Sequence, residues 1–165
     1  MPVTTDIAAT YRSPRAVMRR LLAAGRREDR ALAILMGGCL LAFIGRWPAL
    51  QRAATLETDA EGPSFEAMMA GALFGWIFVA PLLFYGLAAL SHLVARALGG
   101  QGGFFGARLA LFWSFLAAAP LLLLHGLVEG FVGPGPGLQI VGVLWLVAFG
   151  WFWIASLREA EKGMA

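Results

Sequence analysis

The sequence has few charged residues and a single cysteine. Charged residues occupy 14% of its 165 positions, whereas a soluble domain has roughly a quarter of its residues charged. Apolar residues occupy 59%, more than a water-soluble core of this length can bury. Cys39 stands alone among apolar residues, which excludes a disulfide within the chain and indicates a small core residue. These scarcities favour a membrane protein over a soluble domain.

The sequence also lacks patterns of catalysis or metal binding. It contains no nucleophile elbow, no zinc motif and no pair of carboxylates at catalytic spacing. His92 and His125 are predicted to lie on opposite faces of the membrane, so they cannot share a metal. The glycine-rich stretch 99–106 has neither the Gly-Lys-Ser/Thr ending nor the preceding strand of a phosphate loop. We therefore expect no enzyme activity, no metal and no cofactor.

Four long apolar stretches are present instead. They cover about residues 31–50, 67–90, 109–128 and 138–157. Ionisable residues at mid-membrane, which mark transport or proton paths, are missing from these stretches. The pattern predicts an all-α integral membrane protein with four transmembrane helices plus a short N-terminal amphipathic interfacial helix.

Lysine and arginine are distributed unevenly between the segments that join these stretches. Eleven of the thirteen precede the first stretch, separate the second from the third, or follow the fourth. Basic residues in short loops are retained on the cytoplasmic side, so this distribution predicts that both termini are cytoplasmic. Arg46 and Arg52 lie elsewhere, and we expect Arg46 to reach outward to the interface. Because topology accounts for the net charge of +3, we expect no nucleic-acid binding.

The segment before the first stretch contains a short helix pattern. Ser13 and Pro14 are typical of the first positions of a helix, and apolar residues then recur on one face. We expect this helix to lie along the cytoplasmic membrane surface; packing on the protein's own loops is the alternative. The predicted divisions are a flexible N-terminus (1–12), the amphipathic interfacial helix (13–25), a four-span membrane domain (26–158) and a cytoplasmic tail (159–165).

Two of the predicted spans carry small residues at four-residue spacing. This spacing places them on one helix face, where small side chains let two helices approach closely. We expect helix-packing seams within the chain; a dimerisation seam with the same residues facing outward is the alternative. Pro81 and Pro120 are expected to kink the second and third spans. The small residues are Ala67, Gly71 and Gly75 in the second span, and Gly106, Ala110, Ser114 and Ala118 at and within the third.

Basic residues gather on the predicted cytoplasmic face, where they could bind lipid phosphate or a partner. They come from the short N-terminal helix and from the ends of the second and third spans. Charge that merely sets topology is the alternative interpretation. The candidate lipid or partner surface consists of Arg15, Arg19, Arg20, His92, Arg96 and Arg108.

Several segments occur in an order that is similar to a known family. They are Ser13 to Leu22 of the short helix, the proline-bearing Phe78 to Tyr85, its continuation Ser91 to Arg96, and Gly99-Gly100 leading to Gly106-Ala107-Arg108. On these segments the chain resembles bacterial members of the Yip family, multi-spanning membrane proteins whose eukaryotic branch was named for interaction with Rab-type GTPases. The resemblance covers about residues 13–157. The Asp-Leu-Tyr-Gly-Pro motif of the eukaryotic branch is absent, so Rab binding is not implied.

The resemblance implies a bacterial inner-membrane protein that acts through partners or lipids. We therefore expect a non-enzymatic scaffold, accessory or lipid- and partner-interacting protein. Its partners would be membrane lipids and either other membrane proteins or further copies of itself. Two alternatives stay open: a small oligomeric transporter or channel, suggested by the proline-bearing spans, and a supernumerary subunit of a larger respiratory or photosynthetic membrane complex.

Overall fold

The computed structural model describes residues 2–56 and 62–162, and helices account for most of them. No strand occurs in these two ranges. A π-helical segment, η1, joins α4 to α5 so that the three form one continuous helix. The elements are α1 (Val3–Thr10), α2 (Pro14–Ala23), α3 (Glu28–Leu56), α4 (Phe65–Phe74), η1 (Gly75–Val79), α5 (Ala80–Ala97), α6 (Phe104–Phe131) and α7 (Pro136–Ala160).

Four helices of the described chain are long and apolar enough to cross a membrane, judged by length and composition. They are α3, the continuous helix Phe65–Ala97, α6 and α7. The predicted all-α integral membrane protein with four transmembrane helices is therefore confirmed. At about 1.5 Å per residue, the 29 residues of α3 extend over about 43 Å, more than a hydrocarbon core of about 30 Å. The helices thus continue beyond the apolar stretches that predicted them. Most of the acidic connection after α3, residues 57–61, lies outside the described residues.

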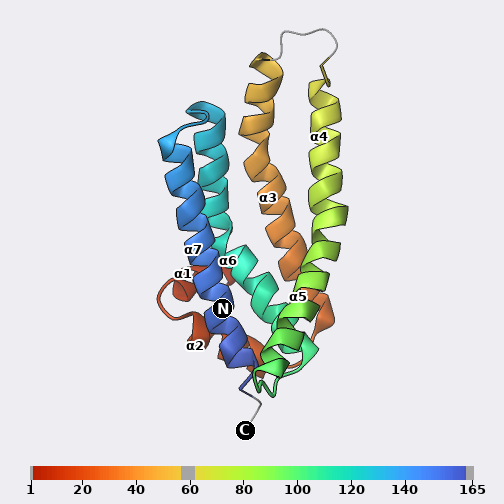
Figure 1. The fold of residues 1–165 in the computed structure, drawn as a ribbon, viewed down its shortest axis with the longest axis vertical. Helices are drawn as coiled ribbons and strands as arrows, with labels where there is room; N and C mark the ends of the chain where they lie inside the picture. Colours follow the sequence, from red (N-terminus) through yellow and green to blue (C-terminus); the bar gives the residue numbers. More distant parts are fainter. Residues whose placement is uncertain (1, 57–61, 163–165) are drawn as a thin grey trace.

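Helix α6 lies at the centre of the bundle, with α3 and α7 packed along it (Figure 1). Between residues 105 and 119 every side chain of α6 except Arg108 is buried. Phe112, Trp113 and Phe115 are the largest of these buried side chains. The hydrophobic core is therefore built around this half of α6, which neighbours cover on all sides.

Glycine allows α3 and α6 to approach closely. A Cβ atom at Gly126 would lie 1.7 Å from the carbonyl oxygen of Gly45, and one at Gly130 would lie 2.3 Å from the Cβ of Pro48. No larger residue fits at either position without moving a backbone. Pro48 lies inside α3, which continues past it to Leu56.

The segment predicted to be flexible, residues 1–12, contains α1, so that prediction is wrong for most of its length. Thr10, at the end of α1, is fully buried, and its hydroxyl accepts a hydrogen bond from the indole N–H of Trp113 at 3.0 Å. Tyr11 packs edge-on against Phe152, and partial burial raises the pKa of its hydroxyl. Contacts with distant helices hold this short helix in place, and a local periodicity pattern cannot reveal such contacts.

The amphipathic helix α2 is present as predicted, beginning at Pro14 after Ser13. Its apolar face is buried: Val17, Met18 and Leu21 belong to the hydrophobic core. This face packs on the chain itself, chiefly on α7. The sequence suggested that this apolar face contacts lipid, but in the structure it contacts protein. The outcome resembles the alternative, packing on the protein itself, although the contact is with helices rather than loops.

Both prolines that were predicted to kink spans lie within continuous helices. Pro81 is the second residue of α5, which begins where η1 ends; η1 is the only π-helical segment in the described ranges. A proline cannot donate the usual helical hydrogen bond, and a π-type turn is one way to rearrange the bonds around it. Helix α6, which contains Pro120, changes direction part-way along its length (Figure 1).

Candidate functional site

The predicted basic surface lies at one end of the bundle. This terminal end carries α1, α2, the connection between α5 and α6, and the last turns of α7 (Figure 1). Four of the six predicted surface residues pair there with a carboxylate of a different element. Three are arginine ion pairs: Arg19–Glu159 at 3.3 Å (α2 to α7), Arg20–Asp6 (α2 to α1) and Arg108–Glu28 (α6 to α3). The fourth is the hydrogen-bonded pair of His92 with Glu161 at 2.7 Å (α5 to the end of α7).

The pair between His92 and Glu161 is the most deeply buried of the four. The two side chains are 2% and 7% exposed, and His92 Nδ1 lies 2.7 Å from Glu161 Oε1. The histidine ring also packs against Phe104, with ring centroids 4.3 Å apart. Buried polar groups need partners, and here each provides one for the other. This pair is thus the polar link that ties α5 to the end of α7.

The glycine-rich connection between α5 and α6 completes the surroundings of Glu161. The N–H of Gly102 donates to Glu161 Oε2 at 3.1 Å, and the N–H of Gln101 donates to the Glu161 carbonyl at 2.8 Å. A Cβ atom at Gly100 would lie 2.7 Å from Glu161 Oε2, so only glycine permits this approach. The connection therefore wraps the end of α7.

The remaining two residues of the predicted surface behave differently. Arg15 on α2 and Arg96 on α5 are exposed. Neither side chain forms a hydrogen bond or ion pair with any residue that the structure describes. The structure thus brings all six residues to one end of the bundle but leaves only these two available as unpaired surface charge.

The two predicted helix-packing seams lie in different surroundings. Gly106, Ala110, Ser114 and Ala118 are all buried on α6. A Cβ atom at Gly106 would lie 3.2 Å from the Cβ of Ala160, which places the start of this series against α7. On α4, Ala67 and Gly71 are exposed, and a Cβ atom at Gly71 or Gly75 would meet no described atom within 4 Å. Within the described chain the second series therefore has no helix packed closely on it.

A second polar group lies toward the opposite end of α3 and α6. Arg46 donates to Glu129 at 2.6 Å, and His125 Nδ1 lies 3.9 Å from the same carboxylate. Arg46 was expected to reach outward to the interface; in the structure its guanidinium pairs with Glu129 of α6. From Arg108 to Glu129, α6 rises by about 31 Å, close to the hydrocarbon thickness. The two polar groups thus mark the two ends of an apolar layer.

Several contributing residues were not singled out from the sequence. Glu159 and Glu161 belong to the segment that was predicted to be a cytoplasmic tail, of which residues 163–165 lie outside the described residues. The structure places Glu159 in α7 and Glu161 just after it. Both take part in the terminal pairs with Arg19 and His92. Gly126 and Gly130 stand four residues apart and form the closest approach of α3 to α6. This spacing was a readable signal, since small residues four apart favour close helix packing.

No group of three or more His, Cys, Asp or Glu side chains suited to a metal ion occurs within residues 2–56 and 62–162. Comparison with known proteins finds no family model, no curated protein and no solved structure that matches the chain. The resemblance to the Yip family accordingly stays a prediction.

Proposed function

We propose that this protein is a non-enzymatic scaffold or accessory protein that binds another membrane-spanning chain on the face formed by α4 and α5. A supernumerary subunit of a larger membrane complex would use the same face, so that alternative is one form of this proposal. The single observation that supports it most is the exposure of the second span.

The four spans differ in how much of each the chain itself covers. In the most apolar 18-residue window of the second span, Phe65–Ala97, 6% of the residues are buried. The corresponding values are 44% for α3, 56% for α6 and 17% for α7. The second span is therefore the least covered of the four, although Trp76, Phe84 and Tyr85 pack against the core. Its outer face is open to lipid or to another helix.

The exposed face also has the composition of a packing surface. Gly71 and Gly75 have open space where a Cβ atom would be. In a membrane, lipid solvates apolar side chains as well as protein does, so association depends on close backbone approach at small residues. A helix from another chain could approach α4 here as closely as α3 approaches α6.

The membrane and orientation form part of the same proposal. The terminal end carries most of the basic residues, and the positive-inside rule places that end in the cytoplasm of a bacterial cell. The order of segments that resembles the Yip family supports a role through partners. Cysteine labelling from outside intact cells would test the orientation: a cysteine at position 134, between α6 and α7, should react, whereas one at position 101 should not.

Purification in a mild detergent followed by native mass spectrometry tests the binding of a partner. The expected result is the chain together with a second membrane-spanning chain or a further copy. Gly71→Leu should reduce the amount of that chain at least tenfold, because the leucine keeps the two backbones apart. Gly150→Leu on α7, where an added Cβ also meets nothing within 4 Å, is the matched control and should leave recovery unchanged. Recovery of the free chain alone would contradict the proposal.

A further inference from the structure

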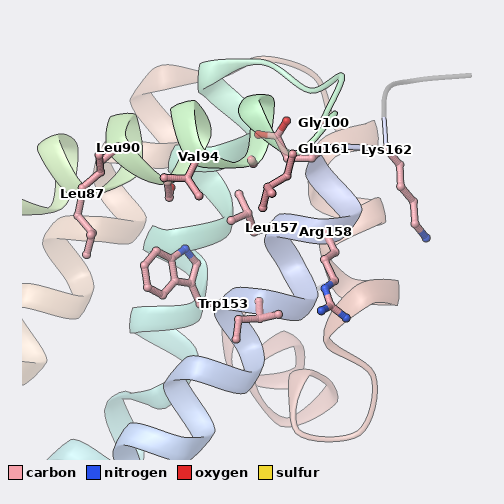
Figure 2. A pocket seen from close by; sticks show the side chains of 13 residues that line it. Leu87, Leu90, Val94, Gly100, Trp153, Leu157, Arg158, Glu161 and Lys162 are labelled. Atoms are coloured by element: carbon pink, nitrogen blue, oxygen red, sulfur yellow. The ribbon is translucent and has the colours of Figure 1, made fainter.

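A groove of about 580 Å³ lies between α5 and α7 near the terminal end. Its walls are apolar: Leu87, Leu90 and Val94 come from α5, and Trp153 and Leu157 come from α7 (Figure 2). Leu90 and Val94 are 57% and 53% exposed, so the groove is open on the outer surface of the bundle rather than closed inside it. In a membrane this opening faces the acyl chains.

Polar groups line the groove only at the end nearest the terminal end of the bundle. Glu161 borders it there, but its carboxylate is engaged by His92 at 2.7 Å and by the N–H of Gly102 at 3.1 Å. That arrangement joins α5 to α7 at the terminal end. The apolar side chains Val94, Leu90 and Trp153 all lie to one side of Glu161, to its left and below it in Figure 2. From Leu87 to Leu98, α5 rises by about 16 Å, which equals about half of a hydrocarbon core of about 30 Å. The groove thus has the length of one leaflet.

Two cations stand on the rim of the groove. Arg158 and Lys162 are four residues apart at the end of α7 and both border the groove. The Arg158 guanidinium is exposed and forms no hydrogen bond or ion pair with the residues that the structure describes. Lys162 Nζ lies 2.9 Å from Glu159, and its side chain is 60% exposed. An exposed pair of this kind is weak, so the lysine is free to exchange partners.

We propose that this groove binds one anionic glycerophospholipid, with an acyl chain between α5 and α7 and its phosphate on Arg158 and Lys162. A planar guanidinium accepts a phosphate through two parallel hydrogen bonds, and the neighbouring ammonium adds a second positive charge. An apolar groove one leaflet long with cations at its polar end matches the shape and charge of such a lipid. The groove lies between α5 and α7 near the terminal end, whereas the proposed helix contact centres on Gly71 in α4, at the other end of the same span. Lipid binding therefore does not depend on the proposed function.

Native mass spectrometry of the purified chain, titrated with phosphatidylglycerol or phosphatidylcholine of identical acyl chains, tests the charge requirement. Wild type should bind phosphatidylglycerol more tightly than phosphatidylcholine. Arg158→Gln with Lys162→Gln should weaken phosphatidylglycerol binding about tenfold or more and abolish the preference. Arg12→Gln with Arg26→Gln removes the same charge from two exposed positions that do not line the groove, and should retain the preference. An equal loss in both double variants would show a general charge effect and overturn the proposal.

A second pair of variants tests the groove itself without changing charge. Val94→Trp places an indole between the helices and should reduce binding of both lipids, whereas Leu93→Trp, at an equally exposed neighbour that does not line the groove, should not. Circular dichroism of the four variants should match wild type. Unchanged lipid binding in Val94→Trp, or loss of a co-purifying protein chain there with lipid binding intact, would overturn the assignment.

Discussion

The close packing of α3 on α6 and the open face of α4 show two uses of small residues in one chain. Between α3 and α6, glycines at positions 45 and 126 bring two backbones into contact, and no Cβ atom fits at Gly126. At Gly71 on α4 and at Gly75, the first residue of η1, a Cβ atom would meet no described atom within 4 Å. The sequence pattern is the same, small residues on one helix face, but only the first is filled within the chain. The difference separates a seam that holds the fold from a surface that the proposed partner would cover.

The largest expected effect comes from placing a leucine in each of the two surroundings. Gly126→Leu would drive a side chain into the backbone of Gly45, and overpacking on this scale costs about 3 kcal/mol or more of the free energy of unfolding. Gly71→Leu enters open space and should change the free energy of unfolding of the single chain by about 0.5 kcal/mol or less. Titration with sodium dodecyl sulfate in mixed micelles, followed by circular dichroism, measures both. Equal effects of the two leucines would remove the distinction between seam and surface.

The next largest effect is expected at the contact between His92 of α5 and Glu161 at the end of α7. Removing His92 leaves Glu161 buried with only part of its hydrogen bonding, so His92→Ala should lower the free energy of unfolding by about 3 kcal/mol. His125→Ala, at a half-buried histidine beside Glu129, is the control and should cost about 1 kcal/mol or less. In a double-mutant cycle, the free energy of unfolding lost in His92→Ala with Glu161→Ala together should differ from the sum of the losses in the two single variants. Independent, additive effects in that cycle would mean that the pair does not fasten α5 to α7.

A smaller effect is expected at the opposite end of the α3 to α6 contact. Arg46 and Glu129 are 43% and 26% exposed, so water screens their interaction. Arg46→Gln should lower the free energy of unfolding by about 1 kcal/mol. Arg96→Gln, at an unpaired exposed arginine, should cost nothing measurable. The same titration in mixed micelles compares the two, and a larger cost for Arg96→Gln would contradict the assigned contacts.

Hydropathy predicted the four spans because the apolar requirement of a membrane acts on each segment separately. The predicted first span ended at residue 50, whereas α3 continues to Leu56, since a helix can extend beyond the apolar layer. Pro48 lies inside α3 without ending it, and Gly130 on α6 leaves room for the proline ring between the two helices. Local patterns thus located the spans better than they located the helix ends.

The polar contacts of the candidate site were less predictable. Arg19, Arg20 and Arg108 were recognised as a basic group, but their carboxylate partners lie on other elements of the folded chain. Likewise α1 depends on a hydrogen bond between Thr10 and Trp113, which are 103 residues apart. Such pairings depend on how the helices pack against one another. The periodicity of a single segment carries no information about that packing.

The central claim, that α4 presents a surface to another chain, is tested most directly by photo-cross-linking in the native membrane. A benzophenone amino acid would replace Phe74, an exposed aromatic residue of α4 three positions from Gly71, in one variant and Val143, an exposed residue of α7, in a second. Gly71 itself is left unchanged, because a large side chain there would block the contact. The account predicts a discrete protein adduct from position 74, identifiable by mass spectrometry, and only lipid adducts from position 143. Lipid adducts alone from position 74, or the same protein adduct from both positions, would contradict it.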